Sequence, residues 1–239
     1  ALRGAEISLA LTAALVLPTA LLLLRCFVLM HECGHGSLFR SDRLNRAFGF
    51  VFGVLGGMPQ LVWSQHHQYH HATNGNWEKY RGPLNIIRTS DYGALSPAQQ
   101  RRYRQARSVW LAPVGGLMYV VVNPRMNWLK GSVALLRHVL AGWWQRPGIS
   151  VVALAHDFKS PHWASWQQYR HMLANNLVFL GACALLSWLV GPLLFLGFYL
   201  SAMALAGGAG IVLFTVQHNF EQSYASGSEG WDYHRAVIE

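Results

Sequence analysis

The sequence is poor in charged residues, and acidic residues are the scarcest of them. Charged residues make up 12% of the 239 residues, whereas 52% are hydrophobic. A soluble domain carries about a quarter charged residues, so this composition excludes an ordinary water-exposed surface and indicates a membrane protein. The 19 Lys and Arg outnumber the 10 Asp and Glu. These basic residues lie in loops beside apolar runs, which favours anionic lipid headgroups over nucleic acid as partners.

Cysteine is scarce as well. Cys26, Cys33 and Cys183 lie in apolar sequence and form no CxxC pair. The cysteines therefore indicate neither a disulfide framework nor a thiolate zinc site. The sequence also lacks internal repeats, low-complexity segments and a secretory signal cleavage site. We expect a single membrane-embedded domain over residues 1–239.

The first long apolar run predicts a membrane crossing near the N-terminal end. Residues 7–24 carry no charge, and the apolar character resumes after Arg25 and reaches Met30. A helix of about 24 residues can span a hydrocarbon core of roughly 30 Å. We therefore expect this helix to deliver His31 to one membrane face.

The second long run is uncharged throughout residues 171–220 and is interrupted by Gly191-Pro192. It is too long for one helix and predicts two antiparallel crossings, 173–190 and 193–216. Three glycines in the second crossing would let a neighbouring helix pack closely: Gly207, Gly208 and Gly210. The sequence therefore predicts an all-α integral membrane helical bundle.

Shorter apolar stretches predict interfacial helices beside these crossings. Residues 47–63 and 109–122 are apolar, and the first joins two histidine groups but is too short to cross twice between them. If those groups share a metal centre, residues 47–63 must lie in the interface plane or re-enter the membrane. Residues 137–146 and 163–170, which are rich in Trp with flanking Arg, are expected to be interfacial anchors.

Seven of the twelve histidines fall into three groups, and each group lies beside an apolar run. Neutral imidazole is a strong ligand for borderline metals. Placing this polar ring next to hydrocarbon costs free energy, so histidines in such places are usually kept for a function. We therefore expect a histidine-lined metal site at a membrane surface. The groups are His31 with His35; His66, His67, His70 and His71; and His218 beside Glu221.

His31 and His35 have i, i+4 spacing, which places both imidazoles on one face of a helix. A pair of interfacial histidines without a metal is the simpler alternative. With Glu32 they also match the HExxH pattern, in which two histidines bind zinc and the glutamate acts as general base of a protease. An intramembrane zinc protease would leave the second histidine group unexplained, so we consider it the weaker hypothesis.

The second group is the more specific signal. His67, His70 and His71 have i, i+3, i+4 spacing, which gathers three rings on one side of a helix. Three such rings rarely occur together without a metal to offset their desolvation. His66 points about 100° away from His67, and we expect it to be a surface histidine more often than a ligand.

Charge bias predicts which face carries the histidines. Residues 79–107 contain seven basic residues against Asp91 alone, and the positive-inside rule places this loop in the cytoplasm. The two crossings 173–190 and 193–216 would return His218 to the same face. A polar run at a helix end could explain His218, but its position makes it a candidate ligand.

Together these motifs resemble the integral-membrane fatty acid desaturases of the histidine-box, di-iron superfamily. The family's first box, HxxxH, corresponds to His31 and His35, and its second, HxxHH, to His67, His70 and His71, preceded by Trp63. A QHxxE-like element of the acyl-lipid branch corresponds to Gln217-His218-Asn219-Phe220-Glu221, and a later element to Trp231-Asp232-Tyr233.

The resemblance implies an O2-dependent enzyme with two non-haem iron ions that introduces a cis double bond into a fatty acyl chain. The implied substrate is a fatty acyl lipid or acyl thioester, and the implied electron donor is ferredoxin-like or cytochrome-like. The implied iron ligands are His31, His35, His67, His70, His71 and His218. Residues expected to support them are Glu32, Trp63, His66, Asn219 and Glu221. Related di-iron hydroxylases, ketolases and decarboxylases share the boxes and remain alternatives.

One departure from the family pattern is important. A third HxxHH box should follow the Trp-Asp-Tyr element, but the sequence ends at Glu239 before reaching it, and it begins at Ala1 without a start Met. We therefore expect a fragment, incomplete at both ends, and an inactive metal-binding remnant is a further hypothesis. The enzyme itself is expected in the cytoplasmic (inner) membrane, with its metal site facing the cytoplasm.

Topology can be tested with single cysteines at Ser90 and Ser223 in a cysteine-free background. Both positions should be protected from a membrane-impermeant thiol reagent in intact cells, because charge bias and crossing parity place both in the cytoplasm. Labelling of one position alone would mean an odd number of crossings between them, and His218 could then not share a metal site with His67.

Overall fold

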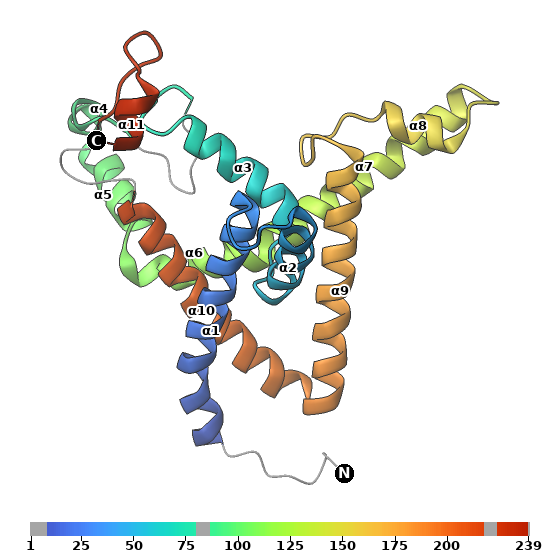
Figure 1. The fold of residues 1–239 in the computed structure, drawn as a ribbon, viewed down its shortest axis with the longest axis horizontal. Helices are drawn as coiled ribbons and strands as arrows, with labels where there is room; N and C mark the ends of the chain where they lie inside the picture. Colours follow the sequence, from blue (N-terminus) through green and yellow to red (C-terminus); the bar gives the residue numbers. More distant parts are fainter. Residues whose placement is uncertain (1–8, 80–86, 218–223, 239) are drawn as a thin grey trace. The chain divides into compact units, whose positions relative to one another are not determined.

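The computed structural model describes residues 9–79, 87–217 and 224–238, which are almost entirely helical (Figure 1). No strand occurs among these residues, although Asn76 and Ser226 form an isolated parallel bridge. The helices are α1 (Leu9–His35), α2 (Asp42–Leu55), α3 (Gln60–Ala72), α4 (Thr89–Ala94), α5 (Pro97–Ala106), the 3-10 helix η2 (Val109–Leu111), α6 (Ala112–Leu117), the π-helix η3 (Met118–Val122), α7 (Asn123–Gln145), α8 (Val151–Asp157), α9 (Trp166–Val190), α10 (Pro192–Gln217) and α11 (Tyr233–Ile238).

The chain forms two compact units. The first contains Cys26–Trp63 and Met118–Gly197, and the second contains Ile7–Arg25, Ser64–Leu117 and Phe198–Glu239. Helices α1, α3 and α10 each contribute residues to both units.

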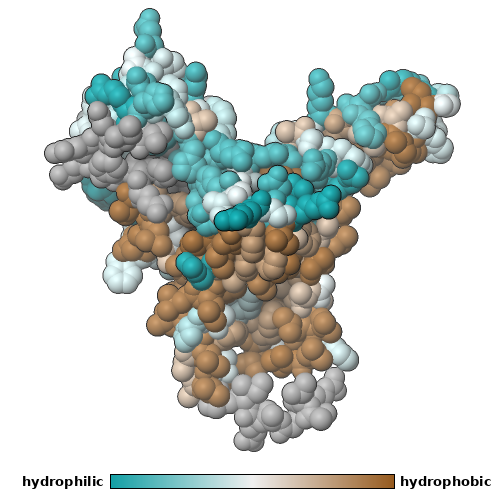
Figure 2. Space-filling view, viewed as in Figure 1, coloured by the Kyte–Doolittle hydropathy of each residue, from teal (hydrophilic) through white to brown (hydrophobic). Residues whose placement is uncertain are grey.

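Three helices are long and apolar enough to cross a membrane: α1, α9 and residues Pro192–Val216 of α10. Helices α9 and α10 contain the second and third predicted crossings. Helix α1 contains residues 9–24 of the first, whose first two residues lie outside the described ones, and continues through Met30 to His35. Only 11% of the most apolar window of α1 is buried, so its side chains face outward as those of a lipid-exposed helix do. Apolar residues predominate in the lower half of the view in Figure 2, with a few hydrophilic residues among them. The predicted all-α membrane fold is confirmed.

Helices α2 and α3 form a sharply bent pair, with 101° between them. Gly57 in the connection has φ of 71°, a left-handed conformation that favours glycine. A Cβ on Gly53 would lie 2.5 Å from the Met58 carbonyl oxygen, so α2 needs glycine there. The Trp63 ring then reaches the His31 ring, with centroids 5.7 Å apart. The chain thus returns to the end of α1 that it left, as expected if residues 47–63 lie in the interface plane or re-enter the membrane.

Arg125 ties this bend to the π-helix. Its guanidinium donates to the carbonyl oxygens of Gly57, Val120 and Val121, the last two at 3.0 Å each, and lies over the Phe179 ring at 4.0 Å. A buried carbonyl without a donor is costly. Arg125 therefore satisfies η3 and the α2–α3 connection with one side chain.

The packing of α7 and α9 corrects one prediction. Trp163, expected to be an interfacial anchor, is only 7% exposed and forms a core cluster with Leu135 and Met172. A Cβ on Gly131 would lie 2.1 Å from the Trp163 ring, so glycine on α7 leaves the space that the indole fills. Trp144, in the other expected anchor, is 85% exposed.

Close helix packing in the second unit confirms the role expected for two glycines of α10. A Cβ on Gly116 of α6 would lie 2.2 Å from the backbone of Gly207 and of Gly208, so the two helices meet backbone to backbone. Gly210 is different, because its nearest neighbour is the Leu24 side chain at an ordinary 3.8 Å.

Replacing Arg125 by Met should destabilise the protein more than the same change at exposed Arg137 on the same helix. Arg125→Met leaves three carbonyls without their donor, which costs about 3 kcal/mol in the free energy of unfolding, whereas Arg137→Met should cost less than about 0.5 kcal/mol. The measurement is the melting temperature of the purified protein in detergent. Equal melting temperatures for the two variants would contradict this account of η3.

Candidate metal centre

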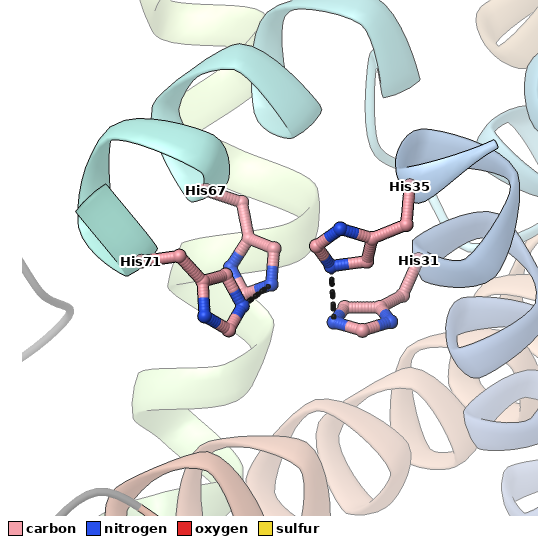
Figure 3. Close-up of side chains that lie close together, drawn as sticks. All are labelled: His31, His35, His67 and His71. Atoms are coloured by element: carbon pink, nitrogen blue, oxygen red, sulfur yellow. Dashed lines mark hydrogen bonds between the residues drawn. The ribbon is translucent and has the colours of Figure 1, made fainter. Parts of the chain in front are cut away.

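The last turn of α1 presents His31 and His35 as a pair (Figure 3). Their Nε2 atoms lie 3.3 Å apart. The Nδ1 atom of His31 lies 2.9 Å from Glu32 Oε1, and the other carboxylate oxygen accepts from Ser37 Oγ at 2.6 Å. An ionised carboxylate can only accept, so it places the imidazole proton on Nδ1 and leaves the Nε2 lone pair of His31 available to a metal.

Helix α3 presents a second pair, His67 and His71, whose Nε2 atoms lie 2.9 Å apart (Figure 3). The His70 ring adjoins both, with its centroid 5.8 Å from that of His67 and 5.7 Å from that of His71. The predicted gathering of three rings on one side of this helix is therefore confirmed. His67 and His70 are buried, whereas His66 is exposed, as expected for a surface histidine.

The spacing within each pair suits a metal ion. Two nitrogens bound to one ion at about 2.1 Å lie about 3 Å apart when the angle at the ion is near 90°. The observed separations of 3.3 Å and 2.9 Å fall in that range. Two lone pairs so close repel each other unless a proton or a cation lies between them, so the donor set fits a borderline metal such as iron.

Trp63 packs beside the His31 ring and contacts two further aromatic residues. Trp63 packs edge-on against Phe27, with centroids 5.2 Å apart, and its Nε1 donates to the Tyr119 hydroxyl at 3.2 Å. Burial raises the pKa of Tyr119, so the phenol stays protonated. Trp63 was expected near the ligands from its position before the second histidine group. Tyr119 was not predicted, because nothing in the apolar run Met118–Val122 distinguishes it.

His171 on α9 is a second residue whose role was not predicted from the sequence. Its Nε2 accepts the backbone N–H of Leu61 at 3.2 Å, and its ring packs edge-on against Phe50 at 5.4 Å. It thereby accepts from a backbone donor in the first turn of α3, where helices need acceptors from outside. Among the sequence candidates, His218, Asn219 and Glu221 lie outside the described residues.

Comparison with known proteins identifies the family. The family model described as "Fatty acid desaturase" matches residues 7–237. A "Fatty acid desaturase" of Bacillus subtilis (strain 168) is 30% identical over 236 residues, covering 98% of this chain and 58% of that protein.

Shorter matches are found in two further desaturases. An "Omega-3 fatty acid desaturase, endoplasmic reticulum" of Vigna radiata var. radiata is 42% identical over 53 residues, 22% of this chain and 14% of that protein. An "sn-1 acyl-lipid omega-3 desaturase (ferredoxin)" of Synechocystis sp. (strain ATCC 27184 / PCC 6803 / Kazusa) is 40% identical over 50 residues, 21% of this chain and 14% of that protein.

The chain thus spans less than two thirds of the length of these relatives. No solved structure matches it significantly. The match over nearly the whole chain, together with the paired histidines, identifies the chain as a member of the fatty acid desaturase family.

Proposed function

We propose that the whole natural protein containing this chain is an O2-dependent di-iron desaturase that introduces a cis double bond into a membrane-bound fatty acyl chain. The observation that carries the proposal is the pairing of Nε2 atoms in His31–His35 and His67–His71, with Glu32 on the opposite nitrogen of His31. The names of the relatives add fatty acid and acyl-lipid substrates, and one names ferredoxin. A ferredoxin-like or cytochrome-like protein is the proposed electron donor.

Both pairs are proposed to bind iron. His31 packs beside Trp63 on α3, and Trp63, His67 and His71 follow one another at i, i+4 spacing on the same face of that helix. Figure 3 labels the two histidines of each pair. His70 and His218 complete the proposed ligands in this chain.

Different residues of the chain have different proposed roles in this function. A bound pair of iron ions would supply the electron-transfer chemistry that activates O2. Glu32 holds the proton of His31 on Nδ1, and Ser37 fixes the carboxylate. Trp63 packs against both the His31 ring and Phe27, and so shields one side of the imidazole with hydrocarbon. The apolar surfaces of α1, α9 and α10 keep the protein among lipids, where the acyl substrate resides.

The proposed location is the cytoplasmic membrane with the histidines on the cytoplasmic face. Residues 79–107 carry seven basic residues against one acidic residue, and that bias supports retention of this loop in the cytoplasm.

Iron content provides the first test. The whole protein purified in detergent should contain about two iron ions per chain, and His67→Ala should lower that number to about one or fewer because a buried ligand is lost. His66→Ala is the matched control, since His66 is the exposed neighbour on the same helix and should leave iron content unchanged. Zinc in place of iron, or equal loss in both variants, would contradict the proposed centre.

The reaction itself is tested by fatty acid analysis. Expression of the whole protein in a host that supplies a reduced ferredoxin should raise the fraction of cis-unsaturated acyl chains. The His71→Ala variant should abolish this increase because its set of metal ligands is incomplete. Mass spectrometry of total lipid fatty acids measures the outcome. Hydroxylated or shortened products would be consistent with the proposed metal centre, but they would show that the reaction is a related oxidation and not desaturation.

A further inference from the structure

The turn that follows the second histidine group is bound to a distant segment of the same unit. Residues 73–79 lie against residues 224–236, and the backbones are joined on both sides of the Asn76–Ser226 bridge. Ser226 N donates to the Gly75 carbonyl at 2.8 Å, and Trp77 N donates to the Ser226 carbonyl at 3.0 Å. The turn is therefore held by residues about 150 positions further along the chain.

Asn74 is the centre of this contact. Its N–H donates to the His71 carbonyl at 3.4 Å, within the end of α3. Its own carbonyl accepts from Trp231 Nε1 at 2.8 Å, and its side-chain amide donates to the Ala236 carbonyl at 3.0 Å. One residue thus joins a proposed ligand, the indole of Trp231 and helix α11.

Gly75, the residue after Asn74, packs closely against Tyr224 and Ala236. Gly75 has φ of +70°, and a Cβ there would lie 2.8 Å from the Tyr224 carbonyl oxygen, so both conformation and space require glycine. At the far end of the turn, hydrogen bonds from the Ser228 side chain and backbone hold the pKa of Glu78 below its ordinary value. The carboxylate is therefore ionised at neutral pH, and the contact is complete there.

Residues 224–236, which bind the turn, form hydrogen bonds among themselves. The Tyr224 hydroxyl donates to the Gly230 carbonyl at 2.6 Å and accepts from Asp232 N at 2.9 Å. Asp232 Oδ1 accepts from Arg235 N at 3.0 Å in the first turn of α11, and the Arg235 guanidinium lies 4.6 Å from the centre of the Tyr224 ring. These contacts hold the residues on both sides of Trp231, whose N–H donates to Asn74.

We propose that Trp231 and Asn74 are positioning residues for the imidazoles of His70 and His71, a proposal that rests on the function proposed above. Both histidines lie in the last turn of α3, which ends at Ala72. The last carbonyls of a helix have no partner within it, and terminal turns fray unless they are held. The Trp231–Asn74 hydrogen bond stops this fraying and so keeps the two rings in the orientation that a metal requires.

The test is Trp231→Phe, which keeps the ring but removes the Nε1 donor, with Trp110→Phe as control. Trp110 is in the same unit and is 87% exposed. In the whole protein, the Fe²⁺ affinity should fall about tenfold in Trp231→Phe, the lower end of the effect known for direct partners of metal ligands, because Trp231 acts through Asn74. It should stay unchanged in Trp110→Phe.

Hydrogen exchange in the metal-free protein provides a readout that does not depend on iron. The amides of Thr73 and Asn74 donate to the carbonyls of His70 and His71, and they should exchange faster in Trp231→Phe than in the wild type. Faster exchange with unchanged Fe²⁺ affinity would overturn the positioning role and leave a structural contact. Unchanged exchange would overturn the proposal outright.

Two further variants separate the possible failures. Asn74→Asp replaces the donor to the Ala236 carbonyl with an acceptor and should reproduce both effects, so it decides the question if Trp231→Phe does not fold. If His67→Ala and His71→Ala leave Fe²⁺ binding unchanged, the proposed metal centre fails and the positioning role falls with it. If those variants lose iron while Trp231→Phe and Asn74→Asp do not, only the positioning role is wrong.

Discussion

The contact between His31 Nδ1 and the Glu32 carboxylate is the constraint on which the candidate centre depends. It decides which nitrogen of His31 carries the proton, and therefore which nitrogen can approach a cation. The pair occurs where a membrane-crossing helix ends, so a polar group needed for chemistry is anchored at the boundary of an apolar segment. Ser37 completes the arrangement by binding the second carboxylate oxygen.

The bend between α2 and α3 has irregular backbone in apolar surroundings, and a few side chains form the hydrogen bonds that this backbone needs. Arg125 supplies donors to three carbonyls, and His171 accepts the first-turn N–H of Leu61. Glycines at the bend provide the remaining freedom, since Gly53 lies where a side chain would meet the Met58 carbonyl. With its backbone satisfied in this way, α3 can bring Trp63 to His31 and continue to the second histidine group.

Helix α3 is therefore fixed at both ends by residues far away in the sequence. His171 holds its first turn, and Asn74 with Trp231 holds the turn that follows it. The histidines between these points lie on a helix of 13 residues, which is too short to be stable by itself in water. Their orientation depends on tertiary contacts at least as much as on helical periodicity.

The sequence by itself determined the three crossings and the pairing of the histidines, because hydropathy and i, i+4 spacing are local properties that a helix converts directly into faces and lengths. It could not determine that Trp163 is buried, since that depends on the space left by Gly131 on another helix. Nor could it identify Tyr119, His171 or Asn74, whose roles come from partners 56, 110 and 157 or more positions away. Only the tertiary structure decided these, because a hydrogen bond between distant residues leaves no periodic trace in either segment.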